Sequence, residues 1–299
     1  MNLPLKPLQG THIVSLALNL PGPAALVRLH GMGAQCTKVH GPAGDPMAQY
    51  SPGAYAQLHS GVRTLSLDLK TPAGQTALHS ELASAQVLLT SFRPSALKKL
   101  QLDWARLHHQ HPQLSMVCIV GSRGTRAEEP GHDLTYLAEH GLVTGTHLPA
   151  TLYADMAGAL MASEAVLQAV LVQKTQGLAT CQEVALADAA AHLALPRAWG
   201  LSQPGGVVGG AHAGYRVYPC LGGRVAVAAL EPHFAKALCQ AAGLQHVDMV
   251  KVGVGNPSTM LQSATQQALS QFFGQRSCAQ LSLLAAEHDL PLLCMPDQP

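Results

Sequence analysis

The stretch THIVSLALNLPGPAALVRLHGMGAQCTKVHG, residues 11–41, carries the pattern that decides the fold. Residues 11–18 form an apolar run rich in β-branched residues, which is typical of a buried strand, and Asn-Leu-Pro-Gly-Pro ends it. Residues 24–34 predict a helix, and residues 36–41 predict a second strand. A strand, a helix and a strand within about thirty residues predict a βαβ unit, in which the two strands pair in parallel.

The same alternation continues along the chain. Residues 85–92 predict a strand that leads into a helix at residues 93–100, and residues 114–122 predict a strand after a helix at residues 103–111. Strands that alternate with helices indicate an α/β fold with a parallel sheet. No G-x-G-x-x-G motif follows the first strand, so the dinucleotide-binding fingerprint is absent. We therefore predict a Rossmann-like architecture with ligand chemistry at the carboxyl ends of the strands.

The pattern of predicted elements changes near residue 200. Residues 215–230 predict a β-hairpin with a Gly-Gly turn, and helical stretches follow it. We therefore expect two domains: a large Rossmann-like domain over residues 1–200 and a smaller α+β domain over residues 201–299.

Composition limits the classes of function. Hydrophobic residues make up 47% of the 299 residues and charged residues 12%, which is typical of a chain that buries a sizeable core. The net charge is +1 and no run of Lys or Arg occurs, so no basic face for nucleic acid is expected.

Cysteine usage and hydropathy indicate the compartment. The 7 cysteines are odd in number and none forms a C-x-x-C pair, which argues against a disulfide framework and against a thiolate zinc site. No metal is expected. The N-terminus does not have the form of a signal peptide, and no apolar segment is expected to reach the roughly 18 residues of a membrane span. These features predict a cytoplasmic protein.

The segment PGHDLTYLAEHGL, residues 130–142, places His132 and Asp133 directly after Gly131 at the start of a predicted helix. First-turn N–H groups favour negative charge, and an imidazole transfers protons near neutral pH. Taken alone, the segment favours a structural interpretation, in which Asp133 caps the helix and His132 is half-exposed.

Two further acids stand at predicted helix starts. Asp155 opens the helix LYADMAGALMASEA, and Glu231 precedes Pro232 in the segment EPHF. An acid in the first turn of a helix is ordinary, because it interacts favourably with the helix dipole. None of the three positions is specific by itself.

Taken together and in this order, the motifs resemble those of the class III CoA-transferase family, also called CaiB/BaiF, and within it the α-methylacyl-CoA racemase branch. The resemblance runs from about Leu8 to Leu293. It is carried by NLPGPAALVRLHGMGAQCTKVHGPAGDP, TLSLDLKTPAGQ, LLTSFRPSALKKLQLDW, GHDLTY and AALEPHF. It implies the fold of that family, an α/β large domain with a small α+β domain, and a homodimer.

The resemblance implies an active site as well. His132 and Asp155 would be the two acid/base residues of a racemase, facing each other across one acyl-CoA, and Glu231 would assist His132. Inversion of a carbon next to a thioester requires a base on each face, together with donors that stabilise the enolate oxygen. The leading prediction is therefore an acyl-CoA racemase or epimerase that acts on a 2-methylacyl-CoA.

Two alternatives remain open. In the transferase branch of the family, the acid that matches Asp155 is a nucleophile that forms a mixed anhydride and passes CoA between carboxylates. That mechanism does not need a histidine at position 132. A third hypothesis is a non-catalytic protein that binds CoA.

The resemblance implies that the substrate is an acyl-CoA and gives candidates for binding its CoA part. These stand at matching motif positions and are Lys38, Arg63, Arg93, Asp133 and Tyr136. One family arginine is replaced, because His40 and Gly41 stand where the family has Glu and Arg.

Overall fold

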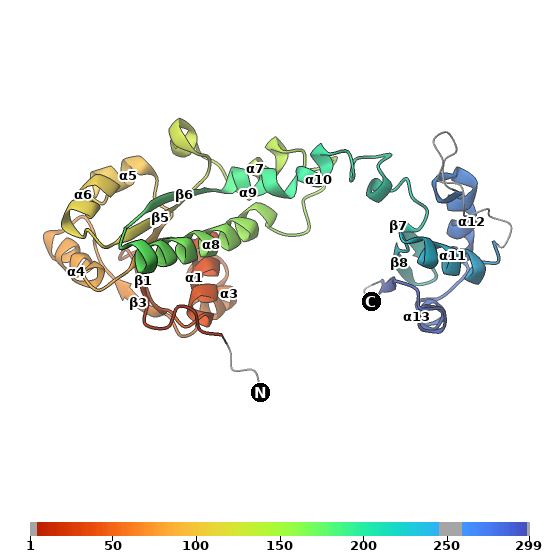
Figure 1. The fold of residues 1–299 in the computed structure, drawn as a ribbon, viewed down its shortest axis with the longest axis horizontal. Coiled ribbons are helices and arrows are strands. Elements are labelled where there is room, and N and C mark those ends of the chain that lie inside the picture. Colours follow the sequence, from red (N-terminus) through yellow and green to blue (C-terminus); the bar gives the residue numbers. More distant parts are fainter. Residues whose placement is uncertain (1–4, 245–258, 298–299) are drawn as a thin grey trace. The chain divides into compact units, whose positions relative to one another are not determined.

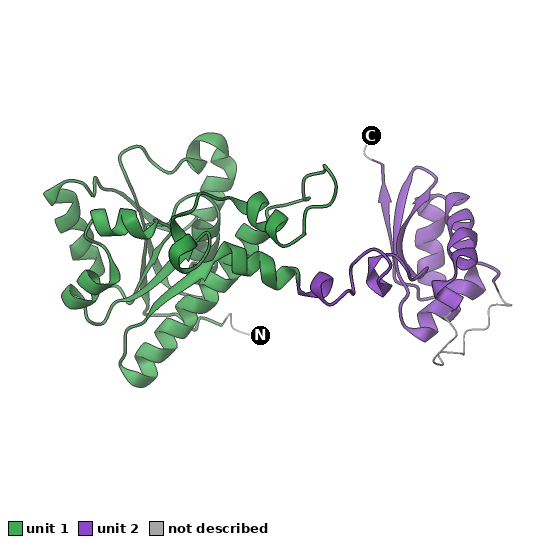
Figure 2. Ribbon diagram, turned by 90° about the horizontal axis from the view of Figure 1, so that it is seen from above, with its two compact units in different colours: residues 1–194 green, residues 195–299 purple. Residues whose placement is uncertain are grey.

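The computed structural model describes residues 5–244 and 259–297. The chain forms two compact units, Met1–Ala194 and Leu195–Pro299, shown separately coloured in Figure 2. The division lies a few residues before the expected boundary at residue 200. Residues 1–4, where no signal peptide is expected, are outside the described residues.

The first unit contains a sheet of six parallel strands (Figure 1). In space the strands follow the order β3-β2-β1-β4-β5-β6. This arrangement confirms the predicted Rossmann-like α/β class, because β1 pairs with both β2 and β4 and the chain changes direction across the sheet there. The strands are β1 (His12–Ser15), β2 (Gln35–His40), β3 (Arg63–Ser66), β4 (Val87–Thr90), β5 (Ser115–Val120) and β6 (Cys181–Ala185).

Helices cover both faces of the sheet. The central strands β1, β4 and β5 are buried at every position because alternate side chains enter two different cores. Ile13 packs in a core with helices α1, α8 and α9, whereas the next residue, Val14, packs in a core with α4, α5 and α6. These helices are α1 (Pro21–Gly31), α4 (Pro72–Leu82), α5 (Pro94–Lys99), α6 (Trp104–Gln110), α8 (Tyr153–Gln176) and α9 (Leu186–Leu193). Shorter elements are α2 (Met47–Tyr50), α3 (Pro52–Leu58), the 3-10 turn η1 (Gly124–Glu128) and α7 (Asp133–Glu139).

Helix α8 corrects one expectation. It has 24 residues and is long and apolar enough to cross a membrane by length and composition, although no such segment was expected. Between Asp155 and Lys174 its only charged residue is Glu164. Its small residues lie in the core against α1 and α9, and a Cβ at Gly158 would approach Leu186 Cδ2 to 2.3 Å. The composition therefore reflects close helix packing.

A buried ion pair joins the ends of β1 and β2. Lys38 and Asp45 are both wholly buried, and Nζ of Lys38 donates to Oδ2 of Asp45 at 2.8 Å and to the carbonyl of Ala17. Oδ1 of Asp45 accepts the backbone N–H groups of Asn19, at 3.3 Å, and of Met47, at 3.0 Å. Burial opposes ionisation of Asp45, but its bonds to Lys38 and to these N–H groups hold its pKa below the ordinary value.

The second unit is α+β, as predicted. Its antiparallel sheet contains β7 (Tyr215–Cys220), β8 (Gly223–Ala228) and β9 (Leu292–Pro296). The predicted hairpin is therefore present, with its turn at Gly222, which has a positive φ of 73°. Side chains of Tyr218, Val225 and Phe273 form part of its core. The helices that pack there are α11 (Pro232–Ala241), α12 (Ser263–Gly274) and α13 (Cys278–Glu287), after the short α10 (Leu195–Ala198) at the start of the unit.

Replacing Lys38 with Met should lower the free energy of unfolding of the first unit by about 3–5 kcal/mol, because Asp45 then stays buried without its cation. The loss should shrink below about pH 4, since the pair stabilises the ionised form of Asp45, whose folded pKa lies below its unfolded value. Urea denaturation followed by Trp104 fluorescence, in a Trp199→Phe background, reports on this unit.

The matched control is Arg63→Met, which removes the exposed ion pair between Arg63 and Glu81. Its effect should stay below about 1 kcal/mol. Equal losses in the two variants would contradict the role assigned to the Lys38–Asp45 pair.

Candidate active site

A pocket of about 510 Å³ opens at the carboxyl ends of β1, β4 and β5. This position lies at the point where strand order reverses, which is where open parallel sheets bind ligands. Residues that follow these strands form one wall, and the starts of α7 and α8 form the other. The lining residues are Leu18–Pro21, Tyr50, Ser91–Arg93, Ile119–Gly121, Ala127, Glu129, Gly131–Leu134, Tyr136, Leu152, Asp155 and Leu186.

The first helix does not provide a phosphate site of the dinucleotide type. Pro21 and Pro23 occupy its first turn and have no N–H to donate. Gly22, between them, packs so closely on Ala17 that an added Cβ would lie 2.2 Å from the Cβ of Ala17. The start of α1 therefore lacks the N–H donors and the accessible backbone that the fingerprint motif provides.

His132 is the residue that caps the start of α7. Its backbone is extended, with φ −141° and ψ 168°. The hydroxyl of Thr135 accepts the His132 N–H at 3.1 Å and donates to the His132 carbonyl at 2.7 Å. The main chain at His132 is thus fixed while the imidazole is exposed in the pocket wall. The structure therefore gives the capping position to His132, whereas the structural interpretation gave it to Asp133.

Asp133 joins the starts of two helices. It is 4% exposed, and its Oδ1 accepts the backbone N–H of Asp155 at 2.9 Å. That N–H belongs to the first turn of α8, where N–H groups have no partner within the helix. Asp133, at the first position of α7, therefore accepts a hydrogen bond from an N–H group that has no partner within α8. This bond holds the starts of the two helices together.

Asp155 has the properties of an acid/base residue. Burial and the nearby charge of Asp133 raise its pKa to about 6, while the charge of His132 acts in the opposite direction. A group with a pKa near the working pH exchanges protons efficiently in either direction. Within the described part of the chain, no hydrogen bond is made to the carboxyl group of Asp155, which leaves it available to a ligand.

Tyr136 lines the pocket and packs so closely on two positions that only glycine fits there. Its side chain is 7% exposed. A Cβ at Gly121 would lie 2.3 Å from the Tyr136 hydroxyl oxygen, and one at Gly131 would lie 2.5 Å from it. The Gly-His-Asp motif therefore needs its glycine for close packing against the tyrosine of the same motif.

The residues predicted to bind CoA do not all lie at the pocket. Arg93 is exposed, begins α5 and lines the pocket together with Asp133 and Tyr136. Lys38 must be corrected: it is wholly buried and its charge is used by Asp45, so it does not face a ligand. Arg63 does not line the pocket either, because it lies on β3 and pairs with Glu81 at 2.9 Å.

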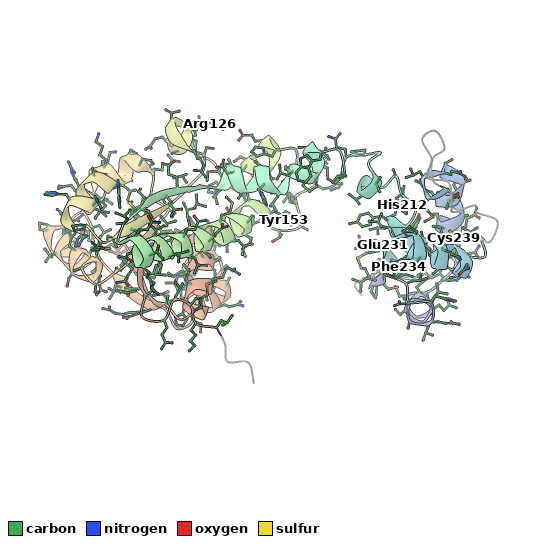
Figure 3. All side chains as sticks on the ribbon, in the orientation of Figure 1. Arg126, Tyr153, His212, Glu231, Phe234 and Cys239 are labelled. Carbon is green, nitrogen blue, oxygen red and sulfur yellow. The ribbon has the colours of Figure 1, made fainter. Side chains whose placement is uncertain are left out.

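Glu231 lies in the second unit, whereas the pocket is lined by the first. It is exposed and precedes α11 without a capping hydrogen bond from its side chain (Figure 3). Its predicted role beside His132 stays a prediction.

Tyr50 and Glu129 line the pocket but were not predicted. Tyr50 belongs to α2, a single turn after the Gly-Asp-Pro segment, and is 64% exposed. Glu129 follows η1 and pairs with Arg126, which also holds Glu139 of α7 at 2.8 Å. Figure 3 shows Arg126 on this outer turn. No local pattern marks either residue in the sequence, because irregular segments bring them to the pocket.

Comparison with known proteins shows the family to which the chain is related. The sequence model of "CoA-transferase family III" matches residues 8–295. A probable fatty acyl-CoA transferase of Mycobacterium tuberculosis is 30% identical over 209 residues, which cover 64% of this chain and 53% of the relative. Human α-methylacyl-CoA racemase is 28% identical over 256 residues, 80% of this chain and 65% of the relative. The matched part thus spans between about half and two thirds of these relatives.

Solved structures share the fold. A crystal structure of the M. tuberculosis protein superposes with a TM-score of 0.83 at 23% identity, covering 97% of this chain and 84% of that one. A CaiB/BaiF family protein from Brucella suis gives a TM-score of 0.78 at 22% identity, covering 96% and 83%. At these identities the likeness concerns the fold, which confirms the predicted architecture.

Replacing Asp155 with Asn should stabilise the protein at pH 7 by about 1–2 kcal/mol, the cost of ionising a partly buried carboxyl group after allowing for solvent screening. The folded pKa of about 6 lies above the unfolded value of 3.8, so wild-type stability falls as the pH rises between them. The gain should therefore be complete above pH 6 and absent below pH 4 in urea titrations. Glu164→Gln, at an exposed position of the same helix, should show no such pH-dependent gain.

Replacing Asp133 with Asn should lower the pKa of Asp155 below 6. The amide oxygen can still accept the Asp155 N–H, but the repelling charge is gone. Carboxyl ¹³C shifts, assigned by comparison with Asp155→Asn, measure the titration directly. An unchanged midpoint would mean that burial alone raises the pKa.

Proposed function

The chain belongs to CoA-transferase family III, and we propose that it is an acyl-CoA racemase or epimerase acting at the α-carbon of a 2-methylacyl-CoA. The observation that carries this proposal is the placement of His132 and Asp155 in the wall of one pocket, close enough for the charge of His132 to lower the pKa of Asp155. Two different titratable groups at one pocket are what a two-base reaction requires.

The reaction would proceed in two proton transfers. One of the two groups removes the α-proton of the thioester, and the other returns a proton to the opposite face of the resulting enolate. With a pKa of about 6, roughly a tenth of Asp155 is protonated at pH 7, so both protonation states are available. The same enzyme can therefore start from either epimer.

The enolate oxygen needs donors as its charge develops. Asp133 and Leu134, in the first turn of α7, line the pocket, and their N–H groups have no acceptor in the described part of the chain. They would be the donors. Arg93 would place its guanidinium against a phosphate of CoA, since it is the only Lys or Arg among the pocket residues of the described chain.

A CoA-transferase is the second candidate, and the free carboxyl group of Asp155 is the observation that favours it. Ionised, this group could attack the thioester carbonyl, expel the CoA thiolate and form a mixed anhydride, which a second carboxylate would then open. Relatives of this chain include the cinnamoyl-CoA:phenyllactate CoA-transferase of Clostridium sporogenes, 32% identical over 150 residues, 46% of this chain and 36% of that one. Such a reaction places no demand on the imidazole of His132.

The proposal is tested by incubating the protein with a 2-methylacyl-CoA in D₂O and following uptake of deuterium at the α-carbon by mass spectrometry. We expect exchange in the wild type and a loss of at least about 100-fold in both His132→Ala and Asp155→Ala, because each removes one proton-transfer group. His140→Ala, at the other end of α7, is the matched control and should exchange at the wild-type rate.

The two candidates give different patterns. If no 2-methylacyl-CoA exchanges while CoA passes to a carboxylate acceptor, and His132→Ala retains that transfer, the racemase proposal is wrong. Hydroxylamine would then trap an acyl group on Asp155, and the trap would be absent in Asp155→Asn.

A further inference from the structure

Three thiols gather in the second unit. Cys220 ends β7, Cys278 begins α13 and Cys294 lies in β9. They are scattered in the sequence, and no disulfide framework was expected. All three are partly exposed, so small reagents in solvent can reach the cluster.

The geometry brings Cys220 and Cys278 into direct contact. Their Sγ atoms are 3.6 Å apart. The neighbouring residues hold the backbones together, since Leu221 and Ser277 form a parallel bridge and the Leu221 N–H donates to the Arg276 carbonyl at 2.9 Å. A disulfide requires about 2.05 Å between sulfurs, so a small side-chain movement is enough.

Cys294 completes the cluster from the other side of Cys278. Both the Cys278 thiol and the Ser282 hydroxyl interact with its sulfur. Cys278 is therefore the central thiol, within reach of two partners on two strands. Neither partner lies in the same element as Cys278, so a bond to either would join α13 covalently to the sheet.

Two thiols of the cluster have raised pKa values. Burial and the Cys278 thiol raise the pKa of Cys220 to about 11, and burial raises the pKa of Cys294. Both therefore keep their protons at neutral pH, and a protonated thiol is a poor nucleophile. Cys278 contacts both of these thiols, so a sulfenic acid at Cys278 lies within reach of either partner.

We propose that Cys220 and Cys278 form a reversible dithiol–disulfide site whose oxidant is a hydroperoxide. The Cys278 thiolate attacks the outer peroxide oxygen, which breaks the O–O bond, releases an alcohol or water, and leaves a sulfenic acid. The Cys220 sulfur then attacks the Cys278 sulfur, and water leaves as the disulfide forms. Overall, two thiols and one hydroperoxide give one disulfide, one alcohol or water, and one water.

The bond would close a loop from β7 to α13 that contains β8, α11 and α12. Closing so long a loop restricts the unfolded chain and stabilises the folded unit. Cys294 would exchange into the bridge when Cys220 is missing, because it contacts the same central sulfur. Oxidation would thus strengthen the second unit and protect Cys278 from irreversible oxidation.

The test treats the full-length protein with one equivalent of hydrogen peroxide at pH 7 and maps the products. Trypsin releases Cys220 in residues 217–224 and Cys278 with Cys294 in residues 277–299, and cleavage after Glu287 separates the last two. We expect a linked peptide that contains Cys220 and Cys278, two hydrogen atoms lighter than its parts. The thermal midpoint of the second unit, followed by Trp199 fluorescence in a Trp104→Phe background, should rise by at least about 5 °C and return with dithiothreitol.

Variants separate this site from general thiol oxidation. Cys278→Ser should abolish the link and the thermal shift, and Cys220→Ser should give a Cys278–Cys294 link instead. Cys181→Ser, which removes an exposed thiol of the first unit, should leave both unchanged. If one equivalent of peroxide yields only singly oxidised Cys278, or if the linked protein melts at the reduced temperature, the proposal is overturned.

Discussion

The buried pair of Lys38 and Asp45 is the constraint on which the pocket depends. It holds the carbonyl of Ala17 and the N–H of Asn19, so it fixes the loop after β1 against the loop after β2. The pair is stable without solvent because Asp45 accepts two backbone N–H groups in addition to its bond with the lysine. A charge left alone at this depth would be strongly destabilising. The wall of the pocket formed by residues 18–21 is thereby held in one conformation.

A second constraint fixes the opposite wall. Asp133 accepts the N–H of Asp155, so the starts of α7 and α8 are joined and His132 and Asp155 are brought to one pocket. The same carboxylate repels the charge of Asp155 and helps to keep its pKa near 6. One residue therefore sets both the position and the proton affinity of its neighbour. A raised pKa of this kind lowers stability at neutral pH, where Asp155 must ionise in a partly buried position.

The fold was predictable to a large extent because its signals are local. Apolar runs that alternate with helical segments indicate parallel strands, and the four strands predicted from such runs, β1, β2, β4 and β5, all lie in the parallel sheet. The hairpin was also predicted, since glycine between alternating residues adopts, without strain, the positive φ that a tight hairpin turn requires. The expectation that no segment could span a membrane did not anticipate α8. A helix that packs through small residues resembles a membrane span in composition, and only its contacts with α1 and α9 show that it packs in a core.

The sequence by itself determined the fold class and named His132, Asp155, Asp133 and Tyr136 as residues of one candidate site, because motif order and residue chemistry are properties of the chain. Only the tertiary structure decided which charged side chains are already paired within the protein. Lys38 appeared to be a ligand for phosphate, but burial commits it to Asp45. Asp133 appeared to cap its own helix, but it serves the next one. Burial, pairing and pKa depend on neighbours distant in sequence, and a linear pattern does not contain those distances.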